Sequence, residues 1–258
     1  MLNPNRIWFK DNPWPNGHAL EKVRFFGILS ENGIFLHLEI ASEKYYAAEG
    51  WEHIRKIAKA HDSQLEKQNV TDDWLYYSSW LNYHSGHIKP NNPIMLGNAE
   101  HSFSMDALHQ MVLRLDDPPP IEATWGGLDF DGMAFHCYVL GHDAVAHHQI
   151  QIQEANKPFE YDIDWTGKVA LAYGGDEDFR YDFIVQLRNL RFEGFDGRPR
   201  RELITSGPQK NRWKDVRNER SMEAREQELR EWMTQFSSID QTQLTFRADH
   251  QSDWLVFQ

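Results

Sequence analysis

Cysteine is almost absent from this chain of 258 residues, in which Cys137 is the only thiol. A single cysteine excludes an internal disulfide framework and is typical of proteins from a reducing compartment. The N-terminal residues, MLNPNRIWFKDNPWPNG, contain no apolar segment of signal-peptide length, and no later stretch has the length and apolar character of a membrane-spanning helix. We therefore expect a soluble cytoplasmic protein that does not associate with membranes.

Positive charge is also scarce. The chain has 27 Lys and Arg against 39 Asp and Glu, which gives a formal net charge of -12. Nucleic acids and anionic membranes attract proteins through a positive field, so this balance argues against general nucleic-acid binding. A basic protein is the kind of partner that such a chain attracts.

Linear catalytic motifs are missing as well. No stretch matches the dinucleotide-binding fingerprint, the phosphate-binding P-loop, the nucleophile elbow or the helical zinc motif. Since many active sites have no linear signature, this absence leaves enzymatic activity open. It favours a protein that is not an enzyme and that needs no cofactor.

The clearest pattern in the chain is a period-two alternation from Phe159 to Phe195. Apolar residues alternate with polar ones in three runs, which predicts three antiparallel strands with one buried face. We expect Trp165-Thr166-Gly167 to form the first turn, because a glycine accepts the left-handed conformation there. An odd loop at Gly174–Asp178 forms the second turn.

This register predicts which side chains point away from the core. The outward face is acidic and has two alanines at its centre, which would let another surface approach closely. Its carboxylates stand ~7 Å apart along the strand. We interpret this face as a binding site for a protein partner, made by Glu160, Asp162, Asp164, Ala170, Ala172 and Asp182.

The remaining patterns predict an α+β fold, dominated by antiparallel sheet with a few helices packed on it. Hairpins are expected at 23–41, turning at Asn32-Gly33, and at 121–140, turning at Asp131-Gly132. Further strands are expected at 147–153, 244–247 and 254–257. Helices are expected from Trp51, from Thr71, at 104–115 (where a strand is the alternative) and at 217–236.

Three prolines, Pro118-Pro119-Pro120, are the best candidate for a domain boundary. They would separate an N-terminal domain of hairpin and helices, 1–117, from a C-terminal sheet domain with one helix, 121–258. A single continuous domain is the alternative.

Histidines near the middle of the chain suggest a second function. His136, His142 and His147, with Asp143, could bind zinc and would make the protein a metal-dependent hydrolase. Their spacing is not diagnostic, and His147 and His148 should point to opposite faces of a strand. A third alternative is a carbohydrate or small-ligand binder, with Trp125 and Tyr138 as a cross-strand aromatic platform.

We expect a binding protein without enzymatic activity, whose acidic sheet face engages a basic protein. An antidote or immunity protein that neutralises a basic toxin enzyme is consistent with the charge, compartment and size, by analogy of class.

Overall fold

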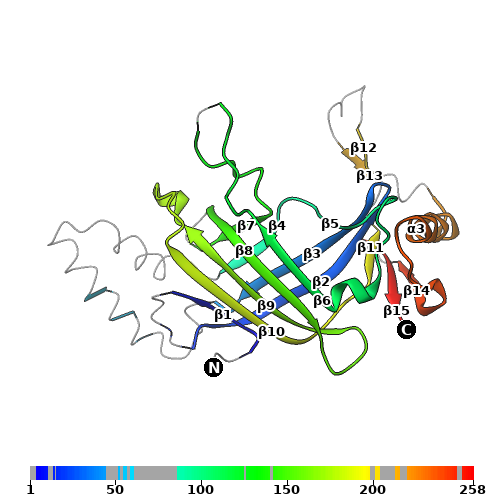
Figure 1. Ribbon diagram of the computed structural model, residues 1–258, viewed down its shortest axis with the longest axis horizontal. Helices are drawn as coiled ribbons and strands as arrows, with labels where there is room; N and C mark the ends of the chain where they lie inside the picture. The colour runs from blue at the N-terminus through cyan, green and yellow to red at the C-terminus, as the bar shows by residue number, and fades with distance from the viewer. Residues whose placement is uncertain are drawn as a thin grey trace. The chain divides into compact units, whose positions relative to one another are not determined.

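The computed structural model describes residues 4–10, 14, 16–44, 52, 55–56, 59–60, 86–124, 126–139, 142–197, 201–203, 213–215, 220–248 and 252–258. The chain is mostly β, and eight of its strands close into an antiparallel barrel (Figure 1). The expected α+β fold, an open antiparallel sheet with a few helices packed on it, is therefore wrong.

The barrel is a ring of strands in the order β2, β1, β10, β9, β8, β7, β4 and β3, and pairing between β2 and β3 completes it. An additional strand, β6, pairs with β8. The bounds of these strands are β1 Arg6–Phe9, β2 His18–Ser30, β3 Gly33–Ser42, β4 His87–Pro90, β6 Gln110–Leu115, β7 Phe135–Tyr138, β8 Asp143–Glu154, β9 Glu160–Ala170 and β10 Tyr181–Arg191.

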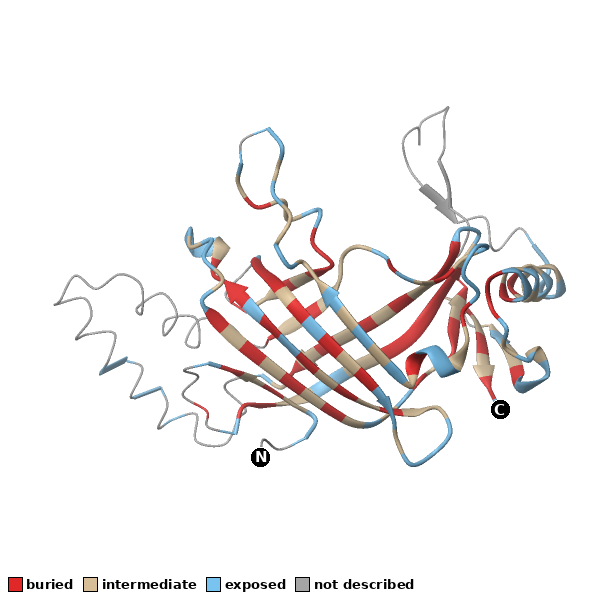
Figure 2. Cartoon of the chain, in the orientation of Figure 1, coloured by how far each residue is buried: buried red, intermediate tan, exposed pale blue. Residues whose placement is uncertain are grey.

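Period-two alternation explains why these segments line a barrel. In β9 the residues Tyr161, Ile163 and Trp165 are buried, while the residues between them are half-buried (Figure 2). β10 alternates in the same way through Phe183 and Val185. The interior is filled by large rings: the Trp165 ring lies 4.8 Å from that of Phe135 and 5.8 Å from that of Phe183.

The turn expected at Trp165-Thr166-Gly167 does not exist, because β9 runs straight through these residues. Trp165 is fully buried and continues the inward-facing series, and Gly167 pairs with Phe183 of β10. The glycine is needed for close approach: a Cβ there would lie 2.6 Å from Cε1 of Phe183. β10 pairs with β9 two residues away from the expected register, which leaves the faces of both strands unchanged.

Replacement of this glycine tests the close approach. We expect Gly167→Ala to lower the free energy of unfolding by about 1–3 kcal/mol, because the new methyl group forces the Phe183 ring to move. Denaturant unfolding measures the change. The neighbouring exposed position serves as the control, and Thr166→Ala should cost about 0.5 kcal/mol or less. Equal stability of Gly167→Ala and the parent protein would contradict the packing described.

The chain forms two compact units. One contains Met1–Arg24, Leu38–Pro93 and Leu108–Arg191, and the other contains Phe25–His37, Ile94–Ala107 and Phe192–Gln258. In the second unit β11 pairs in parallel with β2 and antiparallel with β15. The other elements are β5 Ile94–Gly97, η2 Met105–Leu108, β11 Phe195–Gly197, β12 Arg201–Leu203, β13 Trp213–Asp215, α3 Met222–Phe236, η5 Gln241–Gln243, β14 Leu244–Ala248 and β15 Asp253–Phe257. The boundary at Pro118–Pro120 stays a prediction.

The C-terminal helix and strands agree with the sequence. Ser221 caps α3, since its side chain accepts a hydrogen bond from the amide of Ala224. Leu229, Met233 and Phe236 are buried along one side of the helix, while Met222 is exposed. The expected strands at 244–247 and 254–257 correspond to β14 and β15.

Two of the expected elements are wrong. The helix expected at 104–115 is one 3-10 turn, η2, followed by β6, so the strand alternative is correct for Gln110–Leu115. The segment expected as a hairpin at 121–140 instead contributes β7, which pairs with β4 and β8. The turn at Asp131-Gly132 remains, because the Asp129 side chain accepts from the amide of Gly132.

The odd loop expected at Gly174–Asp178 is also wrong, because β9 ends at Ala170, β10 begins at Tyr181, and a 3-10 turn, η3 Ala172–Gly174, lies in the connection. The remaining expectations are confirmed in part, where the chain is described. The hairpin at 23–41 is β2 and β3, although its turn is Glu31-Asn32 and not the expected Asn32-Gly33, and the strand at 147–153 lies within β8. After Trp51, residues 52, 55–56 and 59–60 are helical and exposed. The helix expected from Thr71 lies outside the described residues. Across the described part of the chain, no helix is both long enough and apolar enough to span a membrane.

Candidate functional site: a charged ladder on the outer wall of β9 and β10

The predicted acidic face lies on the outside of the barrel. Asp162 and Asp164 of β9 and Asp182 of β10 point outward, with side chains 36%, 44% and 48% exposed. Glu160, at the start of β9, is partly covered. The alternation therefore predicted the correct side of the sheet for all four carboxylates, although it placed the turn wrongly.

The two alanines at the centre of the predicted face are covered by the chain itself. Ala170 is fully buried against Leu128 and Met133, and Ala172 packs on the edge of the same cluster. An exposed Ala170 was the expectation, and it is wrong. The small side chains do let another surface approach, but that surface is the segment that precedes β7.

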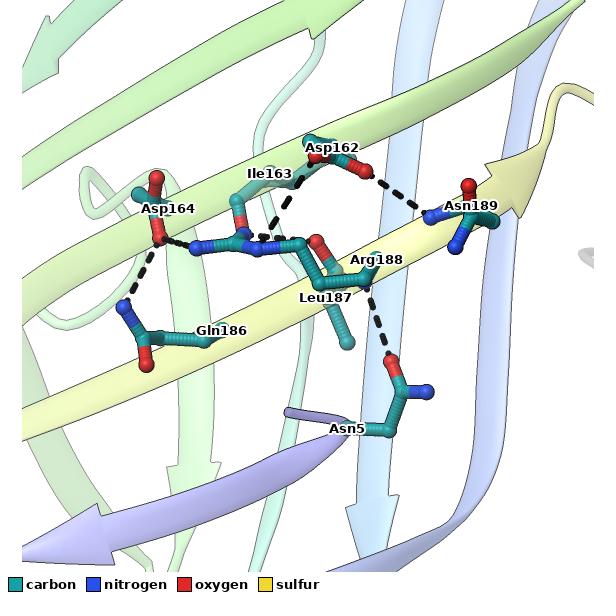
Figure 3. Close-up of polar contacts among 8 residues, drawn as sticks. All are labelled: Asn5, Asp162, Ile163, Asp164, Gln186, Leu187, Arg188 and Asn189. Carbon is teal, nitrogen blue, oxygen red and sulfur yellow. Dashed lines mark hydrogen bonds and ion pairs between the residues drawn. The ribbon is translucent and has the colours of Figure 1, made fainter. Parts of the chain in front are cut away.

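A single arginine organises the carboxylates. The guanidinium of Arg188, in β10, lies 2.6 Å from Asp164 Oδ1 and 3.9 Å from Asp162 Oδ2 (Figure 3). Gln186 donates a further hydrogen bond to Asp164 Oδ1, at 3.1 Å. Arg188 also donates to the backbone carbonyls of Ile163 and Leu187. Together with the bond to Asp164, these hydrogen bonds fix the orientation of the guanidinium.

Arg188 lies at a β-bulge. The pairing of β10 with β9 shifts between Leu187 and Leu190, and Asn189 has a positive φ of 54°. The amide of Asn189 donates to Asp162 Oδ1 at 2.9 Å, and the amide of Arg188 donates to the side chain of Asn5 (Figure 3). Arg188 continues the outward-facing series of Asp182 and Gln186, so the alternation could have placed it on this face, but the alternation does not show which carboxylates it contacts.

Each carboxylate of the predicted face therefore has a cation nearby. Lys168 Nζ lies 3.8 Å from Asp182, and Lys157 Nζ lies 3.4 Å from Glu160. Asp162 and Asp164, however, share the single guanidinium of Arg188. One negative charge remains uncompensated within that group, and we name the group of Asp162, Asp164, Gln186 and Arg188 the charged ladder.

Neighbouring strands surround the charged ladder with amides. The register places Asp164 between Gln186 of β10 and Gln151 of β8, and Thr166 between Ile184 and Gln149. Amide side chains both donate and accept hydrogen bonds. The outer wall at this point can therefore bind polar groups of either kind, on a backbone that β pairing holds rigid.

The histidines proposed as zinc ligands do not form a metal-binding group. His147 bonds Asp117, with 2.8 Å between Nδ1 and Oδ1, and Asp143 is buried and accepts from the amide of Val139. His142 is exposed and lies against Tyr138. Within the described residues, no three His, Cys, Asp or Glu side chains are arranged to hold a metal ion. The His136 imidazole has its pKa lowered by burial and by nearby Lys89.

His148, which was not among the proposed ligands, is one of two buried histidines in the described part of the chain, the other being His18. His148 points inward, as expected from its opposition to His147, and its Nδ1 accepts a hydrogen bond from Trp165 Nε1 at 3.2 Å. Its Nε2 lies 3.7 Å from Asp116 Oδ2. Burial lowers the pKa of His148 to about 3 and raises the pKa of Asp116. The neutral imidazole of His148 thus lies close to the largely covered carboxyl of Asp116, in the segment after β6.

Comparison with known proteins adds no relative: no family model matches the chain, and neither the curated proteins nor the solved structures contain a match.

Proposed function

We propose that this chain is a binding protein without enzymatic activity, and that the charged ladder on β9 and β10 engages a basic protein partner. The observation that carries the proposal is the pair of half-exposed carboxylates, Asp162 and Asp164, which share one guanidinium. A lysine or arginine from a partner can neutralise the remaining charge. It would also find amide acceptors on the strands beside it.

The electrostatics of the whole chain support the same partner. A formal net charge of -12 attracts a basic protein over long range and raises its association rate. The local site then supplies orientation, because its side chains are already held by Arg188 and Gln186. A site that is ordered before binding loses less conformational entropy when the partner docks.

Two variants of the ladder should change binding in opposite directions. Asp162→Asn with Asp164→Asn removes the carboxylates and should weaken the complex about 10-fold or more. Arg188→Gln removes the internal competitor and should strengthen the complex with a basic partner. The test captures partners from the source cells with the full-length chain, identifies them by mass spectrometry, and titrates the purified partner by calorimetry.

The matched control removes two carboxylates elsewhere. Glu21→Gln with Glu100→Gln makes the same change in net charge at exposed positions outside β9 and β10, and should alter affinity less than 3-fold. An acidic partner, or equal affinity of the Asp162→Asn/Asp164→Asn variant and the parent protein, would show that the ladder is not the binding site. Circular dichroism confirms that each variant is folded.

A further inference from the structure

A second group of polar side chains lies on the outside of the barrel, where β4 pairs with β7. The register places His87 opposite Tyr138, and Lys89 opposite His136. Ile88 and Cys137, between them in sequence, are buried inside. Because side chains alternate across a strand, the four polar residues share the outer face. We name these four residues, together with His142, the β4–β7 group.

Tyr138 is the centre of this group. Its ring stacks with that of His87 at 6.2 Å and an interplanar angle of 27°, and the His142 ring lies 4.8 Å away. The ammonium of Lys89 lies 5.4 Å from the centre of the same ring. The aromatic platform predicted from Trp125 and Tyr138 thus has histidine partners, while Trp125 lies outside the described residues.

Carboxylates reach this group from two sides. Glu39 of β3 lies 2.9 Å from Nε2 of His87, and it also bonds Lys22 of β2 at 2.7 Å. Burial lowers the pKa of His136, and nearby Lys89 and His142 lower it further. Asp131, in the segment before β7, raises it. Glu39 is therefore shared by two partners at one end of the group. At the other end Lys89 stands opposite His136 in the register, and Lys89 and His142 both approach the Tyr138 ring, so an ammonium and two imidazoles offer N–H donors from one area of the outer face.

We propose that the outer face of β4 and β7 binds the phosphate group of a small molecule through Lys89, His136 and His142. Phosphate fits better than carboxylate, because the donors come from three separate side chains. A planar carboxylate prefers the paired donors of one arginine, whereas phosphate offers oxygens in three directions. The Tyr138 ring beside the donors supplies a surface for an aromatic group attached to the phosphate.

Nuclear magnetic resonance of the histidine side chains in the full-length protein tests the site. Inorganic phosphate is titrated at constant ionic strength, with sodium chloride as the balancing salt. Saturable shifts of the His136 and His142 signals in the millimolar range are expected. Phenyl phosphate should bind roughly 3- to 10-fold more tightly than inorganic phosphate, because its ring stacks on Tyr138.

Variants separate the parts of the site. Lys89→Gln and His136→Gln should each weaken phosphate binding at least 5-fold, and Tyr138→Leu should remove the advantage of phenyl phosphate alone. His101→Gln, at an exposed position elsewhere, is the control and should leave both affinities unchanged. Shifts that stay linear up to 50 mM phosphate (about ten times the expected dissociation constant), or unchanged binding by Lys89→Gln, would overturn the proposal.

Discussion

The free energy of unfolding is expected to fall by up to about 2.7 kcal/mol per pH unit as the pH drops from 6.5 towards 3. His18 and His148 are buried in the barrel, and burial lowers the pKa of each from 6.5 to about 3. In this window the unfolded chain binds one more proton at each histidine than the folded chain does. The stability is thus fully present above pH 6.5 and is lost during acidification.

Asp116 acts against this trend. Its folded pKa is raised by burial, so the folded chain takes up a proton there first, and this uptake favours the folded state as the pH falls. The measured slope should therefore lie below the limit set by two histidines. Urea unfolding at four pH values between 7 and 4 gives the slope for the parent protein.

The variant His148→Gln tests the assignment. Glutamine does not titrate, so the slope should fall by about 1.4 kcal/mol per pH unit if His148 contributes as described. His101→Gln removes an exposed histidine instead and should leave the slope unchanged. An unaltered slope in His148→Gln would mean that the imidazole is protonated inside the folded barrel.

Removal of Trp165, the largest of the fully buried side chains described, is the second change with a large expected effect. Trp165→Ala should destabilise the protein by about 3–5 kcal/mol, because it opens a cavity among Phe135, Phe183 and His148. Trp165→Phe keeps much of the volume but removes the indole donor to His148. We expect it to cost about 1–3 kcal/mol, since the buried Nδ1 loses its hydrogen-bond partner.

A tyrosine at the end of the same region is the control. Tyr173 is 66% exposed, so Tyr173→Ala should change the free energy of unfolding by about 0.5 kcal/mol or less. Denaturant unfolding of the three variants at pH 7.5 keeps the histidines out of the comparison. A small effect of Trp165→Ala would agree with a turn at this position and would contradict a continuous β9.

Local patterns predicted the faces of the strands well. A period of two reports which side of a sheet a residue occupies, and it is insensitive to a register shift of two residues. Asp162, Asp164 and Asp182 were therefore assigned to the correct face, although Tyr181 pairs with Val169 and not with Leu171, the partner in the expected register. The stretch 217–236 was also recognised as helical from its local pattern, and α3 forms Met222–Phe236 within it.

Interactions between distant segments could not be predicted in the same way. Gly167 looks like a turn residue until the ring of Phe183 is placed against it. Ala170 looks exposed until Leu128 and Met133 cover it. Arg188 falls on the outer face by alternation, but its contacts with Asp162 and Asp164 depend on how β10 pairs with β9, which the alternation does not show. The closure of the barrel likewise depends on pairings that no single segment encodes.

Both β6 and β7 pair with β8, and this arrangement makes the loop between them useful for protein engineering. β9 occupies one edge of β8, and on the other edge β7 pairs with Asp143 and Ala144, while β6 pairs with residues 148–153. The chain between β6 and β7 thus leaves β8 and comes back to it, with a bridge between Ile121 and Leu128 at its base. Residues 122–127 are consequently a suitable place to insert a reporter domain or to open new termini, since the hydrogen-bonded ladder would stay intact.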